Sequence, residues 1–162
     1  MLLGGAKPVP VNPRNYRNYK RGDIIVSLAG VATNLVIAIG CALLFPLLGM
    51  LGRGVPSLEV SAAILQAMMV QGLMLNLVLI FFNLIPIPPL DGSHVMKYLL
   101  PASLSLRYQQ ISRYGIIVLI ALMWITPGAL SFLMTPAFKT FGWTYTQIEG
   151  GMLPSTRQWL AR

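Results

Sequence analysis

Charged residues are absent from three long stretches of this 162-residue chain. The stretches cover residues 24–52, 60–90 and 114–138, and they are 29, 31 and 25 residues long. A helix needs roughly 20 apolar residues to cross a hydrocarbon core about 30 Å thick. All three stretches exceed that length, so the sequence predicts an all-α, polytopic membrane protein.

The composition excludes an ordinary water-soluble domain. Hydrophobic residues make up 56% of the chain and charged residues only 10%, whereas soluble domains contain about 25% charged residues. The 12 Lys and Arg outnumber the 4 Asp and Glu, which gives a net charge of +8. Beside apolar spans such an excess indicates contact with anionic membrane lipid and not with nucleic acid.

Proline residues interrupt two of the three stretches. The second stretch is predicted to be helical only to about Ile85, because prolines at positions 86, 88 and 89 remove backbone donors. The third contains Thr-Pro-Gly at residues 126–128. It forms either one kinked span or a shorter helix followed by a second apolar piece. We therefore expect three transmembrane helices, or four if the third stretch crosses twice.

Basic residues predict the orientation and the division of the chain. Five Lys and Arg precede the first span, whereas the loop after it contains only Arg53. Positive charge accumulates on the cytoplasmic side, so we expect a multi-pass protein of the plasma membrane with a cytoplasmic N-terminus. The predicted regions are a Pro- and Arg-rich cytoplasmic segment at 1–23, beginning with a short extended piece, a transmembrane core at 24–138, and an interfacial tail at 139–162.

Asp91 is the carboxylate that the sequence places closest to membrane depth. It follows an apolar helix and the proline break with no polar residue between them, and a carboxylate there is a functional candidate. The competing interpretation is an N-cap for a helix that begins at Gly92 or Ser93. Position and chemistry alone favour neither. Asp23, Glu59 and Glu149 flank the apolar stretches and are expected to be solvated.

Other polar residues offer weaker signals. His94 lies three residues after Asp91, a spacing that allows a metal pair, but a lone histidine at headgroup level is more often a plain interfacial residue. Asn83 must satisfy its amide within an apolar segment, through a carbonyl near the proline break or through a bound peptide. Asn34 and Asn76 are expected to make hydrogen bonds between helices.

The sequence N-L-I-P-I-P-P-L-D-G at residues 83–92 closely resembles the N-x-x-P-x-P-x-x-D-G signature of the site-2 protease family of intramembrane zinc metalloproteases. Similar family patterns occur in A-K-P-V-P-V-N-P at residues 6–13 and in L-A-G at residues 28–30 with Asn34-Leu35. The resemblance covers about residues 4–100. One departure is Val31, where the family usually has proline.

The resemblance implies a protease that hydrolyses peptide bonds in membrane-embedded substrates. It implies that Asp91 is the third zinc ligand and that Asn83, near it, either binds substrate or breaks the helix. The other two ligands in that family are the histidines of an H-E-x-x-H helix, whose glutamate activates water.

The second departure from the family is that His94 is the only histidine, so these residues contain no H-E-x-x-H. The chain is then either part of a longer enzyme or a natural remnant without catalytic capacity. We expect the isolated chain to bind zinc weakly and to be inactive. The alternative function is a non-catalytic membrane protein that binds transmembrane partners, and a homo-oligomer is left open.

Overall fold

The computed structural model describes residues 19–112 and 114–161, and these residues form helices and no strands. The extended segment predicted near the N-terminus lies outside the described residues. The α-helices are α1 (Tyr19–Gly54), α2 (Glu59–Asn83), α3 (Asp91–Leu99), α4 (Ala102–Ser112), α5 (Gly115–Ile125), α6 (Pro127–Ile148) and α7 (Pro154–Leu160). Two short 3-10 turns, η2 (Pro56–Leu58) and η3 (Glu149–Gly151), complete the element order. The all-α prediction is confirmed.

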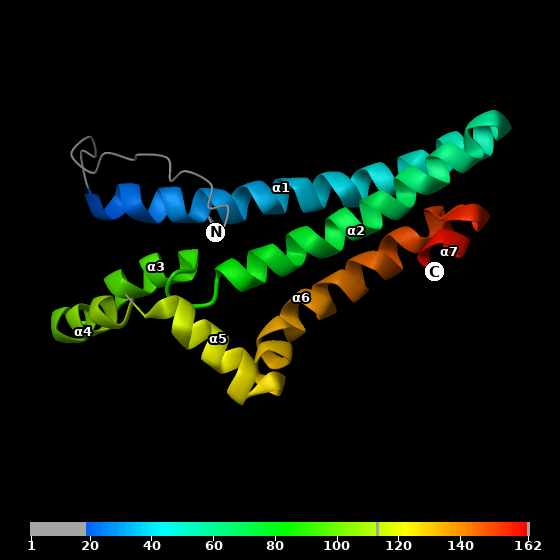
Figure 1. Ribbon diagram of the computed structural model, residues 1–162. Helices are drawn as coiled ribbons and strands as arrows, with labels where there is room; N and C mark the ends of the chain where they lie inside the picture. Colours follow the sequence, from blue (N-terminus) through cyan, green and yellow to red (C-terminus); the bar gives the residue numbers. More distant parts are fainter. Residues whose placement is uncertain (1–18, 113, 162) are drawn as a thin grey trace, which may run out of the picture.

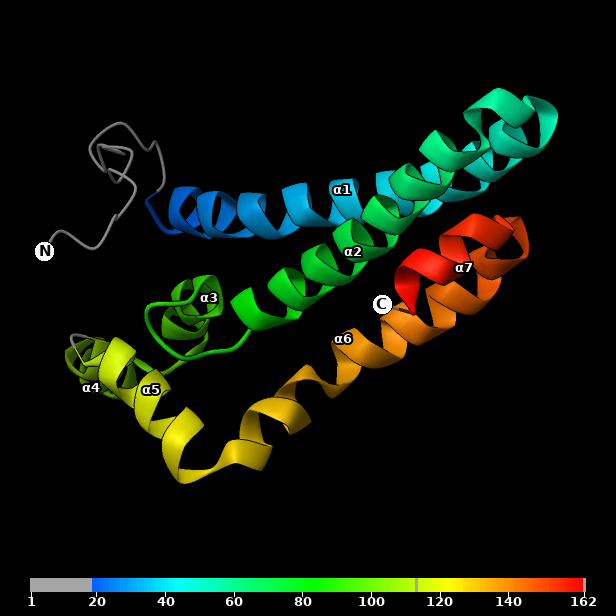
Figure 2. The same ribbon diagram turned by 45° about the vertical axis from the view of Figure 1, so that its right-hand side comes forward.

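Helices α1 and α2 form a long antiparallel hairpin (Figures 1 and 2). Its core contains the small residues Ala38 and Cys41 against Leu73 and Leu77. A Cβ atom on Gly72 would lie 2.9 Å from the Cys41 sulfur. Small side chains let apolar helices approach closely in this way, which favours their association in a membrane.

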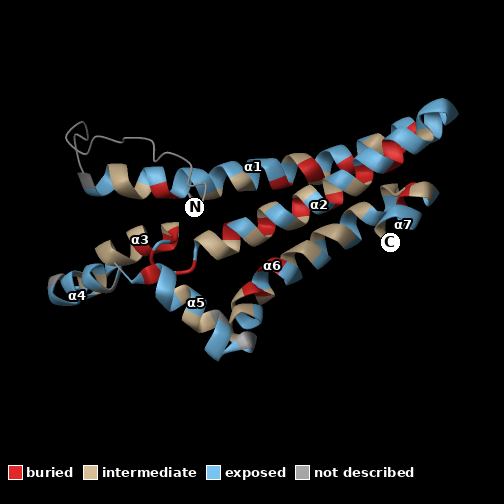
Figure 3. Ribbon diagram, viewed as in Figure 1, coloured by how far each residue is buried: buried red, intermediate tan, exposed pale blue. Residues whose placement is uncertain are grey.

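Many large apolar residues of the hairpin are exposed, and Figure 3 shows exposed positions along both of its helices. Two helical stretches are long and apolar enough to cross a membrane, Lys20–Gly54 and Pro56–Asn83. In each stretch, only 28% of the most apolar 18-residue segment is buried. A core helix of a soluble protein would be covered on most sides. The outward apolar face therefore suits lipid, while the predicted third and fourth spans are not among these two stretches.

The third apolar stretch is broken into two helices. Helix α5 ends at Ile125 and α6 begins at Pro127, with Thr126 between them in a non-helical conformation. Proline lacks an N–H donor and disfavours helical geometry in the residue before it. The two helices form a V (Figure 2). Of the two predicted forms, the structure has the shorter helix followed by a second piece.

Helix α6 extends across the boundary that we predicted at residues 138 and 139, and it ends only at Ile148. It packs against α2, and a buried cluster of Ile85, Leu90 and Met134 joins α6 to the segment after α2. After α6 the chain folds back, so that α7 also contacts α2. The predicted tail thus includes the last part of a long helix.

Candidate metal-ligand site at the proline loop

The loop at residues 84–90 connects the end of α2 to the start of α3. It contains three prolines, so few backbone donors remain. The Ile87 N–H donates to the Ile85 carbonyl at 2.8 Å, and the Leu90 N–H donates to the Ile87 carbonyl at 2.9 Å. The sequence prediction that the second helix stops at this break is confirmed, since α2 ends at Asn83.

Asp91 is the first residue of α3, and Leu90 before it occupies the N-cap position in extended geometry. The carboxylate is half-buried and makes no hydrogen bond to any residue in the described part of the chain. The predicted N-cap role is therefore wrong in its geometry, because the helix begins one residue earlier. What remains for the carboxylate is a weaker interaction with the N-terminal end of the helix dipole, and its oxygens are available to a ligand.

Asp91 lies against α1 at Gly30. A Cβ atom on Gly30 would be 3.5 Å from the Asp91 Oδ2 atom, so the carboxylate sits directly on the surface of α1. Gly30 belongs to the Leu-Ala-Gly segment that the sequence singled out. Two segments about sixty residues apart, each carrying part of the family resemblance, thus meet at the carboxylate.

Gly92 explains why the motif pairs aspartate with glycine. A Cβ atom there would clash with the Leu84 carbonyl and lie 2.8 Å from the Ile85 carbonyl oxygen. Only a residue without a side chain allows the first turn of α3 to pack against the start of the loop. This contact fixes where Asp91 stands relative to the end of α2.

Two residues from later in the chain hold the loop from outside. The Tyr108 hydroxyl on α4 donates a hydrogen bond to the Pro86 carbonyl at 2.9 Å. At the start of α5, a Cβ atom on Gly115 would overlap the Pro88 carbonyl, so α5 contacts the loop backbone directly. The sequence contained no local signal for either contact, because each joins residues more than twenty positions apart.

The structure does not show the expected hydrogen bonds between helices for the side-chain amides of Asn34 and Asn76. Asn76 donates to the Gly72 carbonyl of its own helix at 2.8 Å, so the predicted bond between helices is wrong for this residue. The side-chain amides of Asn34 and Asn83 have no hydrogen-bond partner among the described residues. Asn83 is half-buried at the last position of α2, directly before the loop. Its amide is free to bind a further group.

His94 points away from a metal pair with Asp91. Its Nδ1 atom lies 3.3 Å from Oδ1 of Asp23, a residue of α1. Asp23 also pairs with Lys97 and accepts a hydrogen bond from Tyr98 at 3.0 Å. The side chains of Asp23 and Lys97 are only 19% and 17% exposed, so the expectation that Asp23 is simply solvated is wrong.

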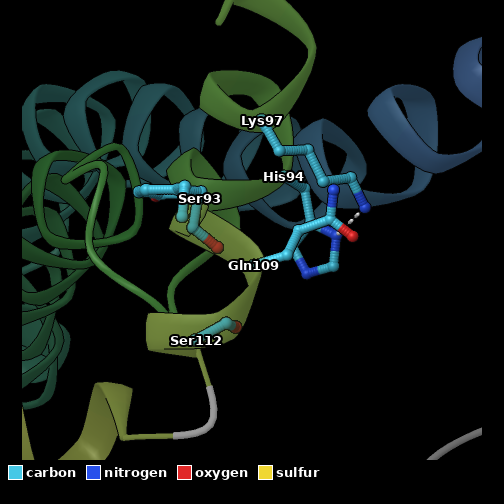
Figure 4. A pocket seen from close by; sticks show the side chains of 6 residues that line it. Ser93, His94, Lys97, Gln109 and Ser112 are labelled. Carbon is cyan, nitrogen blue, oxygen red and sulfur yellow. Dashed lines mark hydrogen bonds between the residues drawn. The ribbon is translucent and has the colours of Figure 1, made fainter. Parts of the chain in front are cut away.

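A polar pocket of about 200 Å³ lies beside this cluster, between α3 and α4 (Figure 4). The lining residues are Ser93, His94, Lys97, Tyr108, Gln109 and Ser112. Burial raises the pKa of Tyr108 and outweighs the opposing effect of Ser93, which keeps the hydroxyl protonated as a donor.

A complete metal site is absent from the described part of the chain, where no three His, Cys, Asp or Glu side chains come together. A catalytic zinc site needs three protein ligands and one open position. Asp91 supplies one carboxylate of suitable type and exposure. The described residues therefore supply one ligand that suits zinc and not the three that a catalytic site needs.

Comparison with known proteins decides the family. The family model of peptidase family M50 matches residues 48–125, which include the proline loop and Asp91. The chain is also 37% identical over 126 residues to the Bacillus subtilis (strain 168) protein named "Putative zinc metalloprotease YwhC", an alignment that covers 77% of this chain. The chain belongs to the site-2 protease family. No solved structure matches it.

Membership in the site-2 protease family accounts for the motif at residues 83–92. The chain spans 56% of the length of the Bacillus subtilis relative that it matches. What the whole relative does is consequently a basis for a proposal about this chain and not a finding about it.

Proposed function

We propose that this chain forms the part of an intramembrane zinc metalloprotease that carries the carboxylate metal ligand. The single observation that carries the proposal is the placement of Asp91. It stands half-buried at the start of α3, on the surface of α1, with no hydrogen-bond partner among the described residues. A carboxylate kept without a partner beside apolar helices is costly unless it serves a ligand.

Zinc would need two further ligands, and in the site-2 protease family these are histidines. This sequence contains one histidine, and its ring lies against Asp23. In the proposal, Asp91 joins histidines from outside these 162 residues, and the isolated chain binds zinc weakly and hydrolyses nothing. When held by three protein ligands, zinc activates water for peptide-bond hydrolysis.

Asn83 is proposed to bind the substrate backbone. Its amide is half-buried and unpaired among the described residues, at the point where α2 gives way to the proline loop. A transmembrane substrate must unwind before its carbonyl can be attacked, and unwinding frees backbone donors and acceptors. An amide side chain can satisfy one of each.

The proposed setting is the plasma membrane, with residues 1–23 in the cytoplasm and residues 24–138 as the transmembrane core. The partners are membrane lipid and transmembrane-segment substrates. In this arrangement α5 and α6 make the third crossing together, because they lead from the loop end of the α1–α2 hairpin to its other end (Figure 1). The tail, including α7, then lies outside.

A second candidate function is a non-catalytic membrane protein that binds transmembrane partners with the same scaffold. The observation that favours it is the single suitable ligand at the site. The two functions differ in one expectation: once histidines are supplied, only the protease needs Asp91 for zinc binding and cleavage.

The test joins this chain to a family segment that carries H-E-x-x-H and compares Asp91→Asn with the unchanged residue. Asparagine conserves volume and removes only the interaction of the negative charge with the helix dipole, so stability should change by about 0.5 kcal/mol. Loss of a group that only hydrogen-bonds a metal ligand already costs roughly 10- to 100-fold in metal affinity or activity. We therefore expect zinc content and cleavage of a transmembrane substrate to fall at least about 100-fold.

The matched control is His94→Ala, which should retain zinc and activity because its ring faces Asp23. Full activity in Asp91→Asn would refute the ligand assignment. Absence of zinc and of cleavage in every variant, including the unchanged chain, would favour the non-catalytic function.

A further inference from the structure

Helix α3 lies antiparallel along the first turns of α1, and it is attached at both ends. At its start, the Asp91 carboxylate lies on Gly30. At its end, Lys97 pairs with Asp23. The two contact points are six positions apart on α3 and seven positions apart on α1. At a rise of about 1.5 Å per residue, the distance between the two contacts is therefore similar along both helices.

Among the described residues, the side-chain contacts of Asp23 come from α3. The Tyr98 hydroxyl donates to Oδ2 at 3.0 Å, the Lys97 ammonium pairs with the same oxygen, and the His94 ring lies 3.3 Å from Oδ1. The Lys97 ammonium also lies 4.8 Å from the centre of the Tyr98 ring. One carboxylate on α1 thus contacts three polar side chains of α3, those of His94, Lys97 and Tyr98.

The partners of Asp23 are suited to a lasting contact. Asp23 and Lys97 are each less than one-fifth exposed, so water screens their attraction less than at an open surface. Burial, followed by the hydrogen bond to Asp23, raises the pKa of Tyr98, so that its hydroxyl stays protonated and remains a donor.

Helix α3 needs such attachments because it has nine residues. An isolated helix shorter than about 12–15 residues is marginal in water, and most helical stability in proteins comes from tertiary contacts. The start of α3 is held by Gly92 under the proline loop. Without Asp23, the other end would lose its ion pair and its hydrogen bond to α1, and the Lys20 ammonium on α1, 5.4 Å from the centre of the Tyr98 ring, would remain beside it.

We propose that Asp23 is a positioning residue for Asp91. It holds the end of α3 through Lys97 and Tyr98, and this keeps the metal-ligand carboxylate at the start of the same short helix seated on α1. The role of Asp91 in this inference rests on the proposed function. The control of position 91 on α1 by Asp23 does not depend on the proposed function.

The first experiment measures the exposure of position 91 without any enzyme activity. The full chain carries Cys41→Ala and Asp91→Cys, and the rate at which a maleimide labels the introduced thiol is measured in membranes. Adding Asp23→Asn should increase the labelling rate about tenfold, since a hydrogen bond to a charged group is worth about that factor in an equilibrium. Tyr98→Phe, which removes only one donor, should increase it about threefold.

Two variants serve as controls. Asp23→Glu keeps the carboxylate and should leave the labelling rate within about twofold. Glu59→Gln alters a carboxylate at the far end of the hairpin, where Glu59 accepts a hydrogen bond from Ser155 at 2.8 Å, and should also leave the rate unchanged. Unchanged labelling in both Asp23→Asn and Tyr98→Phe would overturn the inference. An equal increase in Glu59→Gln would overturn it too, because it would show general loosening.

The second experiment uses this chain joined to the family segment that carries H-E-x-x-H, with Asp91 unchanged. Asp23→Asn should lower kcat severalfold while KM for the transmembrane substrate stays within about twofold. A kcat equal to that of the unchanged enzyme would overturn the positioning role. If labelling responds as expected but no variant cleaves substrate, the proposed function fails while the control of position 91 by Asp23 stands.

Discussion

Gln66 is completely buried on α2 and uses its side-chain amide for four hydrogen bonds. It donates to the carbonyls of Phe45 and Gly151, both at 2.9 Å. Its oxygen accepts from the Leu153 N–H at 3.1 Å and from the Thr156 hydroxyl at 2.6 Å. One amide therefore joins α1, α2 and the segment after α6, at the end of the hairpin opposite Asp91.

Replacing Gln66 with Leu should strongly destabilise the fold. The apolar side chain would leave several buried polar groups without partners, and each such group costs about 1–3 kcal/mol. We expect a loss of about 3 kcal/mol in the free energy of unfolding, measured by denaturant titration in detergent. Gln71→Leu is the control, because Gln71 is exposed on the same helix and its replacement should change stability by less than about 0.5 kcal/mol. Equal effects in the two variants would contradict this account.

Tyr108 allows a prediction about pH. Burial raises the pKa of Tyr108 above its ordinary value, so folding favours the protonated hydroxyl that donates to the Pro86 carbonyl. A raised folded-state pKa gives a stabilisation that is complete below the unfolded pKa and is lost as pH rises through the folded pKa. Tyr108→Phe should cost about 1 kcal/mol at neutral pH.

The same variant should lose less of its stability than the unchanged chain when the pH is raised above about 10. Thermal unfolding in detergent at neutral and alkaline pH measures both effects. An identical alkaline loss in the two proteins would show that Tyr108 does not titrate with folding.

At the scale of elements, the breaks in the helices were predictable from the sequence. Proline lacks an N–H donor and constrains the residue before it, so the interruptions after Asn83 and at Pro127 follow from local chemistry. The placement of α3 along α1 was not predictable. It depends on contacts of Asp23 and Gly30 with residues more than sixty positions away.

The candidate site was also only partly predictable from the sequence. Asp91 was identifiable because a carboxylate after an apolar helix is unusual and because the residues around it resemble a family motif. The sequence singled out Gly30 as part of a family pattern but did not link it to Asp91, and the hydroxyl of Tyr108 left no local pattern. Periodicity and spacing describe neighbours along one helix, whereas these contacts join separate helices.

The packing of α3 under the loop gives a prediction at this scale. Gly92→Ala introduces a Cβ that would clash with the Leu84 carbonyl, and the backbone cannot yield without moving α3. Overpacking of this kind costs about 1–3 kcal/mol. Gly128→Ala on α6 is the matched control, because nothing lies within 4 Å of its Cβ position. We expect loss of stability only in Gly92→Ala, and equal melting of the two variants would contradict the packing.

At the scale of the whole molecule, polar contacts concentrate at the two ends of the α1–α2 hairpin. Asp23 and Lys97 join α1 to α3 at one end. At the other end, Arg53 donates to the Gly150 and Met152 carbonyls at 3.1 and 3.0 Å, which fixes the turn after α6 beside the hairpin's own turn. Apolar residues dominate the outward surface between these ends. This distribution suits a molecule whose ends lie at opposite membrane surfaces.

The path of α5 and α6 between the two ends leads to a prediction about topology. Single cysteines are introduced by Ser103→Cys, Ser57→Cys and Gln158→Cys in a chain with Cys41→Ala, since all three positions are exposed. A membrane-impermeant maleimide should label positions 57 and 158 in intact cells, and position 103 only after the membrane is opened. The reason is that α7 packs against α2 near the hairpin turn, whereas α4 lies beside α3 at the other end (Figure 1). Labelling of position 158 from the same side as position 103 would mean that the broken pair α5 and α6 returns without crossing, or crosses twice.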